Sequence, residues 1–144
     1  MELALRSAVR RRAHGRCEYC MLPEAHSPVP FQVEHIIARQ HGGPTRLSNL
    51  ALACHRDNLS KGPNLAGLDP VTRRLVPLFH PRRMKWSRHF RWDGTFLVGR
   101  TGSGRATIAV LRMNHKERIE LRQTLIDESI FPPRRSRSSG SGPA

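Results

Sequence analysis

Two cysteines separated by two residues, Cys17 and Cys20, and a third at Cys54 set narrow bounds on how this chain folds. Three cysteines are an odd number and too few for a disulfide framework, so a small disulfide-stapled scaffold is excluded. A C-x-x-C pair in a reduced compartment is typical of a metal-binding knuckle. The alternative is redox chemistry, which predicts a thioredoxin-like alternation of strands and helices that the sequence lacks. We therefore expect a metal-binding turn here.

A chain of 144 residues has the length of one domain with an ordinary core. We expect a single domain over residues 1–131, with a core at about 15–62 and a basic extension at about 63–131. The basic, Ser- and Gly-rich tail at 132–144 has nothing to bury and is expected to be disordered. Neither a membrane span nor the apolar stretch of a signal peptide is present, so we expect an intracellular, cytoplasmic protein without a membrane partner.

The formal net charge is +14, and most of it lies in the second half of the chain. Residues 73–144 hold 16 basic and 5 acidic side chains, against 9 and 6 in residues 1–72. Between Asp69 and Asp93 there is no acid, and basic side chains alternate with Phe and Trp. This pattern is typical of nucleic-acid binding, although the aromatic residues alone also suit the inner face of a hairpin. The candidate nucleic-acid contacts are Arg82, Arg83, Lys85 and Arg88.

Local patterns in the first half predict two strands and two helices. Residues 3–14 are good helix formers, and Gly15 is a typical helix stop. Alternating apolar and polar side chains predict a strand at 31–37, and the apolar stretch 50–54 predicts a second. A short helix follows at 54–61.

The second half predicts more strands and then helices, so the class is α+β. A strand is expected at 75–79, and the segment 89–99 contains an Asp-Gly turn and predicts a hairpin. After a flexible TGSG segment at 101–104, a helix is expected at 105–113. A last helix, from a capping box at Asn114 and Glu117 to about Ser129, is expected to pack its Ile and Leu residues in the core.

Several short motifs follow one another in a distinctive order between residues 17 and 61. After C-x-x-C come Glu34-His35, Gly42-Gly43, Asn49-Leu50, Cys54 and Asn58-x-x-Lys61. In this order and spacing the sequence resembles the HNH endonuclease family. The resemblance covers about a third of the chain and implies a ββα-metal (His-Me finger) core, here with an N-terminal helix and a C-terminal β-hairpin plus helix extension. The extension also resembles that of a bacterial subgroup, which implies a bacterial or phage origin.

The resemblance implies a role for each matching polar residue. Glu34 and Asn58 would bind a catalytic Mg²⁺ or Mn²⁺, His35 would activate water, Asn49 would orient the base or its loop, and Lys61 would face a phosphate. The residue types suit these roles by themselves, because neutral imidazole accepts a proton near pH 7 and hard oxygen donors bind Mg²⁺. One geometric condition follows: neighbouring strand residues point to opposite faces, so the strand must end or bulge at Glu34-His35.

The family usually has a second C-x-x-C pair, and this chain departs from it with Cys54-His-Arg-Asp57. Asp57 has the required spacing, and a carboxylate oxygen is an accepted zinc ligand. The resemblance thus implies structural zinc on Cys17, Cys20, Cys54 and Asp57. Two alternatives stay open: His55 as the fourth ligand, and a degenerate knuckle without metal.

These observations predict a metal-dependent HNH endonuclease, a hydrolase of phosphodiester bonds whose substrate is nucleic acid, with double-stranded DNA expected over RNA. The competing hypothesis is a zinc-stapled nucleic-acid-binding module with little or no turnover. The set Glu34, His35, Asn49 and Asn58 favours the enzyme, because a pure binder has no need for a base beside two oxygen ligands.

Overall fold

The computed structural model describes residues 1–133, in which five α-helices and three antiparallel two-stranded sheets occur. This mixture confirms the α+β class. Of the tail predicted at 132–144, residues 134–144 lie outside the described part of the chain. Within residues 1–133, no helix is both long and apolar enough to cross a bilayer.

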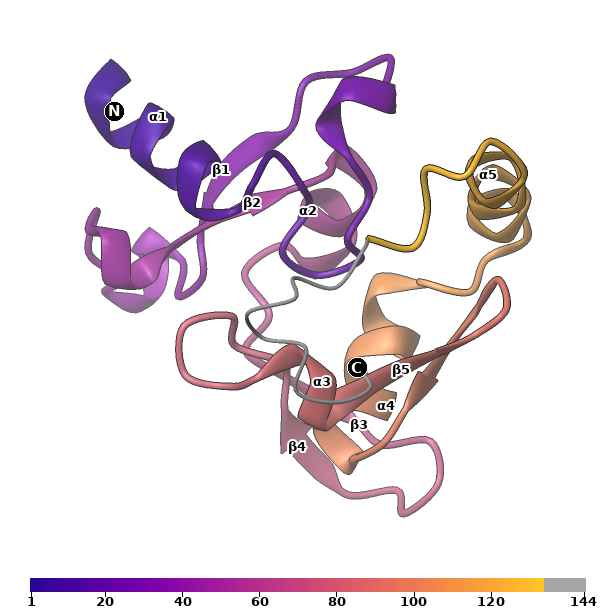
Figure 1. The fold of residues 1–144 in the computed structure, drawn as a ribbon. Helices are drawn as coiled ribbons and strands as arrows, with labels where there is room; N and C mark the ends of the chain where they lie inside the picture. Colours follow the sequence, from indigo (N-terminus) through magenta and orange to yellow (C-terminus); the bar gives the residue numbers. More distant parts are fainter. Residues whose placement is uncertain (134–144) are drawn as a thin grey trace.

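The first half contains the two strands and two helices that its patterns predict. Helix α1 (Leu3–Arg12) packs beside strand β2 (Leu50–Ala53). Strand β1 (Gln32–His35) pairs with β2 so that Glu34 lies opposite Ala51. Helix α2 (His55–Lys61) follows at once and packs against β1. These three elements form a ββα unit beside α1 (Figure 1).

Two short 3₁₀ turns, Arg39–His41 and Leu47–Asn49, connect β1 to β2. Gly43 lies between them where the backbone passes very close to Ile37. A Cβ atom at position 43 would lie 1.7 Å from the Ile37 carbonyl oxygen, so only glycine fits. Close backbone packing therefore explains the second glycine of the Gly-Gly motif, which lies in the connection after the strand bearing Glu34 and His35.

The extension is built from two hairpins. Strand β3 (Ala66–Leu68) pairs with β4 (Leu75–Pro77), and β5 (Phe90–Asp93) pairs with β6 (Phe96–Gly99). The second hairpin was expected from its Asp-Gly turn, whereas β3 was missed because Ala-Gly-Leu has no β-branched or aromatic residue. A short helix, α3 (Trp86–His89), precedes β5.

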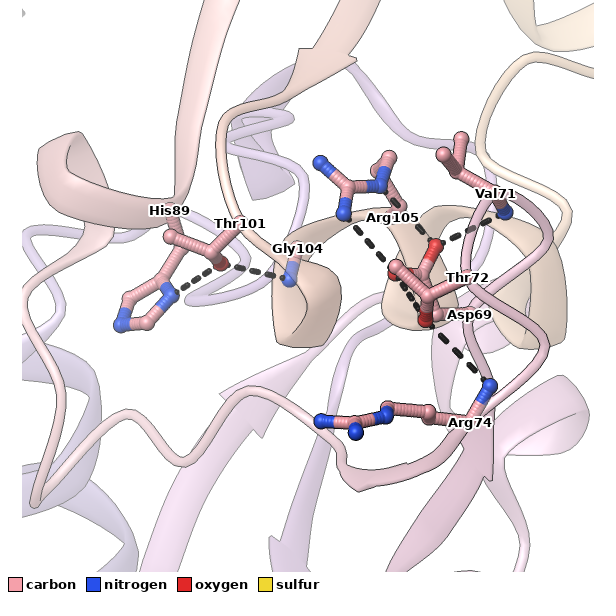
Figure 2. Close-up of polar contacts among 8 residues, drawn as sticks. All are labelled: Asp69, Val71, Thr72, Arg74, His89, Thr101, Gly104 and Arg105. Atoms are coloured by element: carbon pink, nitrogen blue, oxygen red, sulfur yellow. Dashed lines mark hydrogen bonds and ion pairs between the residues drawn. The ribbon is translucent and has the colours of Figure 1, made fainter.

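The TGSG segment is not the flexible link that its composition suggested. Thr101 caps helix α4 (Gly102–Leu111), and its hydroxyl accepts from the Gly104 amide at 3.0 Å while contacting the His89 ring at 2.6 Å (Figure 2). A Cβ at position 104 would lie 2.1 Å from the His89 carbonyl oxygen. The glycines thus permit close packing of α4 against the β5–β6 hairpin, and α4 also contacts α2.

Helix α5 (Lys116–Asp127) corrects two further expectations. Asn114 does not cap it, because the Asn114 side chain instead bonds the Leu97 amide at 2.9 Å and the Leu97 carbonyl at 2.8 Å. The helix buries Leu125 but also Arg118 and Arg122, whereas Leu121 is exposed. The spacing of apolar residues along the helix does not show that hydrogen-bond acceptors for Arg118 and Arg122 lie on its buried side.

One buried apolar cluster joins both halves of the chain. It contains Val9 of α1, Leu52 of β2, Phe79 and Phe90 of the extension, and Leu111 of α4. Phe79 packs edge-on against Phe90 with ring centroids 5.3 Å apart. Phe90, one of the aromatic residues that alternate with the basic residues, therefore packs in the core. This is what the alternative interpretation, the inner face of a hairpin, predicted.

Candidate metal centre and active site

Four buried side chains converge where the knuckle meets the start of α2. Cys17 and Cys20 come from the knuckle, Cys54 is the N-cap of α2, and Asp57 lies in its first turn. Their ligand atoms all lie within 4.8 Å of one another. The fold therefore brings together the four residues that the sequence had grouped.

The spacing of these atoms fits a tetrahedral zinc ion. Zn–S bonds of about 2.3 Å in a tetrahedron place two sulfurs about 3.8 Å apart. Cys20 Sγ and Cys54 Sγ are separated by 3.8 Å, and Cys17 Sγ lies 3.2 Å from Asp57 Oδ2. His55 is exposed and outside this group, so Asp57 is the fourth donor in the cluster.

The electrostatics of the cluster suit a cation. Hydrogen bonds from the Cys17 and Cys20 thiols lower the pKa of Cys54 to about 5, whereas burial raises the pKa of Cys17 well above its usual value. Burial also raises the pKa of Asp57 to about 7. Metal binding deprotonates thiols, so a bound divalent cation would balance the negative charge of the thiolates and of the Asp57 carboxylate in this buried cluster.

Sequence analysis missed Arg118, which lies next to the cluster. Its Nη2 is 2.8 Å from Asp57 Oδ1, and its Nη1 donates to the Leu111 carbonyl at 2.9 Å. The guanidinium thus ties α5 to the oxygen of Asp57 that faces away from Cys17. No local signal marks it, because an arginine in a basic helix is usually solvated.

Glu34 lies on the buried face of β1. Its Oε1 accepts a hydrogen bond from the Tyr19 hydroxyl, and its Oε2 is 3.6 Å from Lys61 Nζ. Burial raises the pKa of Glu34 to about 7, against the opposing effect of the Lys61 charge. Burial likewise raises the pKa of Tyr19 well above its usual value, so the Tyr19 hydroxyl keeps its proton and donates.

Strand β1 ends at His35, but His35 still pairs with Leu50 in the regular register, so the end of the strand does not bring its side chain to the face of Glu34. Its side chain is half-buried on the face opposite Glu34, and Nε2 is 2.8 Å from Thr45 Oγ1. Burial and the Arg39 charge lower the pKa of His35, so the imidazole is neutral at pH 7. Thr45, another partner that sequence analysis missed, comes from the connection between β1 and β2.

Asn49 is buried and organises this connection. Its Oδ1 accepts from the Ile37 amide at 2.9 Å, and its Nδ2 donates to the carbonyls of Ile37 and Pro44 at 3.0 and 2.9 Å. The side chain therefore joins the two ends of the turn that carries Thr45 to His35. Such an arrangement can orient His35 through the loop that carries Thr45.

Asn58 and Lys61 lie three residues apart on α2 and so share a face. Asn58 is half-buried, and Lys61 Nζ donates to the Ile36 carbonyl at 2.8 Å beside Glu34. The donors Glu34 and Asn58 are both hard oxygens, which suit Mg²⁺ or Mn²⁺ because these ions retain waters and need few protein ligands. A cation bound by Glu34 and Asn58 would contact the same carboxylate that faces Lys61.

The residues predicted to contact nucleic acid differ in exposure. Lys61 is only 2% exposed and points at Glu34, so its phosphate role stays a prediction. Arg82 is half-buried and paired with Glu18. The three that are exposed are Arg83, Lys85 and Arg88.

Comparison with known families gives one finding for this region. Residues 17–64 match the family model described as HNH endonuclease. Searches of curated proteins and of solved structures found no match. The matched segment contains the knuckle, β1, β2 and α2, and with them the cysteine cluster and the proposed active-site residues. The chain therefore contains an HNH endonuclease domain at residues 17–64, which confirms the resemblance over this third of its length.

Proposed function

We propose that this protein is a metal-dependent HNH endonuclease that hydrolyses phosphodiester bonds in DNA. The observation that carries the proposal is His35, a neutral and partly accessible imidazole held by Thr45 at the end of β1, with the buried Glu34 carboxylate next to it in sequence. Hydrolysis of a phosphodiester requires a general base and a hard-oxygen donor for a cation, and His35 and Glu34 supply these two groups from opposite faces of β1.

His35 is the general base in this proposal. In the tautomer with hydrogen on Nε2, Thr45 Oγ1 accepts that hydrogen and Nδ1 is left to take a proton from water. Asn49 keeps the loop bearing Thr45 in place, so the imidazole meets the water in a defined orientation. The ring also stays unprotonated near pH 7 because nearby Arg39 and burial disfavour its cation.

Glu34 and Asn58 would hold Mg²⁺ or Mn²⁺. When bound, such a cation stabilises negative charge on the phosphorane and on the leaving 3′ oxygen. Tyr19 and Lys61 both contact the Glu34 carboxylate, and the charge of Lys61 favours the ionised form of Glu34. Structural zinc on the Cys₃Asp cluster would join the knuckle to α2, which carries Asn58.

The substrate in this proposal is double-stranded DNA, supported by the net charge of +14 and the exposed Arg83, Lys85 and Arg88. Affinity that depends on phosphate contacts falls steeply with salt, because counterions are released on binding. Thiol ligands for zinc persist in a reducing compartment, so we also propose an intracellular setting, in a bacterium or phage as the resemblance implies.

Plasmid nicking tests the proposal. We expect the purified protein to nick plasmid in Mg²⁺ or Mn²⁺, and EDTA or His35→Ala to abolish nicking. His26→Ala is the matched control, because His26 is exposed and has none of the roles proposed for the motif residues. Cutting by H35A at the wild-type rate would exclude His35 as the base.

A binding module without turnover is the second candidate. The observation in its favour is Lys61, which places a positive charge at 3.6 Å from the carboxylate that a catalytic cation would use. DNA binding with no cleavage beyond the H35A background, in either metal, would support this candidate for DNA. RNA is then the next substrate to test.

A further inference from the structure

The metal-binding knuckle and the proposed catalytic carboxylate are joined by one side chain, Tyr19. It lies between the two knuckle cysteines and is 1% exposed. Its hydroxyl donates to Glu34 Oε1, and Glu34 is itself a buried residue of β1. The contact joins segments 15 residues apart in the chain.

The tyrosine ring has little freedom to move. Its edge packs against Phe79, with centroids 6.2 Å apart and planes at 84°. Its backbone carbonyl accepts from Trp86 Nε1 at 2.8 Å. The knuckle backbone is held as well, because the Met21 amide donates to the Cys17 carbonyl at 2.9 Å. The hydroxyl therefore reaches Glu34 from a rigid support.

Glu34 is held at both oxygens. Tyr19 engages Oε1, while Oε2 faces Lys61 Nζ at 3.6 Å. With Oε1 fixed by the Tyr19 hydroxyl, Glu34 presents its other oxygen in a set direction. The Lys61 ammonium donates to the Ile36 carbonyl at 2.8 Å and lies 3.6 Å from Oε2, so Oε2 can bind a cation while the Tyr19 hydroxyl keeps Oε1 in place.

We infer that Tyr19 is a positioning residue that orients Glu34 for the catalytic divalent cation, so that the zinc knuckle sets the geometry of the active site. The inference rests on the proposed function, because it takes Glu34 as a ligand of that cation. Groups that orient metal ligands from behind typically contribute a factor of roughly 10 to 100 in metal affinity or activity.

The first test compares Mn²⁺ binding by the zinc-loaded full chain and by Tyr19→Phe, measured by calorimetry. This substitution keeps the ring and removes only the hydroxyl. We expect Mn²⁺ affinity to fall roughly 10- to 100-fold while zinc content stays at the wild-type value. Trp86→Phe is the matched control, because it removes the other side-chain hydrogen bond to Tyr19 and leaves the hydroxyl on Glu34; its Mn²⁺ affinity should equal that of the wild type.

A second measurement needs no substitution at position 19. Tyr19 is the only tyrosine in the chain, so 3-fluorotyrosine gives a single ¹⁹F resonance beside Glu34. We expect Mg²⁺ to shift this resonance in otherwise wild-type protein and to leave it unmoved in Glu34→Gln. This outcome decides the matter even where Y19F loses zinc or unfolds.

The outcomes separate this inference from the function on which it rests. A wild-type chain that binds neither Mn²⁺ nor Mg²⁺ overturns the proposed catalytic cation and this inference with it. If the wild type binds Mn²⁺ and Y19F binds it equally well, Tyr19 has no positioning role, although the nuclease proposal stands. A Mg²⁺ shift that persists in E34Q would show that the cation does not need Glu34, which overturns both the assignment of Glu34 as its ligand and this inference.

Discussion

Arg118 Nη2 of helix α5 lies 2.8 Å from Asp57 Oδ1, with both side chains buried beside the cysteine cluster. Truncating one partner of a buried ion pair leaves the other charge uncompensated, which typically costs about 3–5 kcal/mol. We therefore expect Arg118→Met to lower the free energy of unfolding by roughly that amount in urea denaturation. It should also speed the release of zinc to a chelator.

A matched exposed pair provides the control for Arg118. Arg56 pairs with Glu117 at side chains that are 53% and 60% exposed. Solvent screens an ion pair this exposed, so Arg56→Met should change stability little. Equal losses in R118M and R56M would show that the pair with Asp57 has no special role.

The fourth metal ligand is tested by zinc content. We expect Asp57→Ala to lose bound zinc and to melt at lower temperature, because three cysteines leave the tetrahedron incomplete. Asp57→Cys should retain zinc, since it restores a C-x-x-C pair. His55→Ala should match the wild type because His55 is exposed and outside the cluster. Zinc loss in H55A with retention in D57A would reverse the assignment.

Asn49→Ala should destabilise the loop between β1 and β2. The substitution leaves the Ile37 amide and carbonyl without their side-chain partner, and each unsatisfied buried group costs about 1–3 kcal/mol. The Pro44 carbonyl also loses its partner but belongs to an exposed residue that water can reach. We expect a loss of about 3 kcal/mol in unfolding and faster amide exchange at 37–45. The control is Asn64→Ala, at an exposed position; a loop as protected in N49A as in N64A would contradict the bracing role.

Acid stability should depend on Asp69. Its carboxylate accepts from Arg105 Nε and Nη2 at 2.9 and 2.8 Å, and from the Val71 amide and Thr72 hydroxyl (Figure 2). Hydrogen bonds from Arg105 hold the pKa of Asp69 well below its usual value. Because the folded-state pKa is depressed, this contribution is complete above the unfolded pKa of about 3.9 and is lost as pH falls below it.

We expect Asp69→Asn to be less stable than the wild type at pH 7, with the difference shrinking as pH falls below about 4. Urea denaturation across pH measures it. Asp93→Asn, at an exposed turn of the second hairpin, is the control. A wild-type advantage that stayed constant down to pH 2 would refute the linkage.

Capping by Thr101 is a further point of stability. Thr101→Ala removes the hydroxyl that accepts from the Gly104 amide and meets His89, so we expect a loss of about 1 kcal/mol. Thr101→Ser keeps the hydroxyl and should lose less. Thermal unfolding of the two variants makes the comparison, and equal stability would show that the cap contributes nothing.

Much of the core could be predicted because its signals are local. Alternating polarity predicted β1, a continuous apolar stretch predicted β2, the Asp-Gly turn predicted the second hairpin, and the spacing of Cys17 and Cys20 indicated a metal knuckle. Strand geometry also required β1 to end or bulge at Glu34-His35 if both side chains were to reach one site, and the structure keeps them on opposite faces. Each of these rests on neighbours within a few residues, where sterics and side-chain period act directly.

Tertiary structure decided what depends on partners far along the chain. Asp57 rather than His55 joins the cysteines because the first turn of α2 points Asp57 inward. The Lys61 ammonium lies beside Glu34 and away from solvent. Arg118 is buried next to Asp57, with which it forms an ion pair. Tyr19 contacts Glu34 only when the knuckle packs on β1. The sequence by itself determined which chemical groups the site has to use. The tertiary structure decided which of these groups pair with one another, because burying a charge or a hydroxyl is costly unless the fold places a partner next to it.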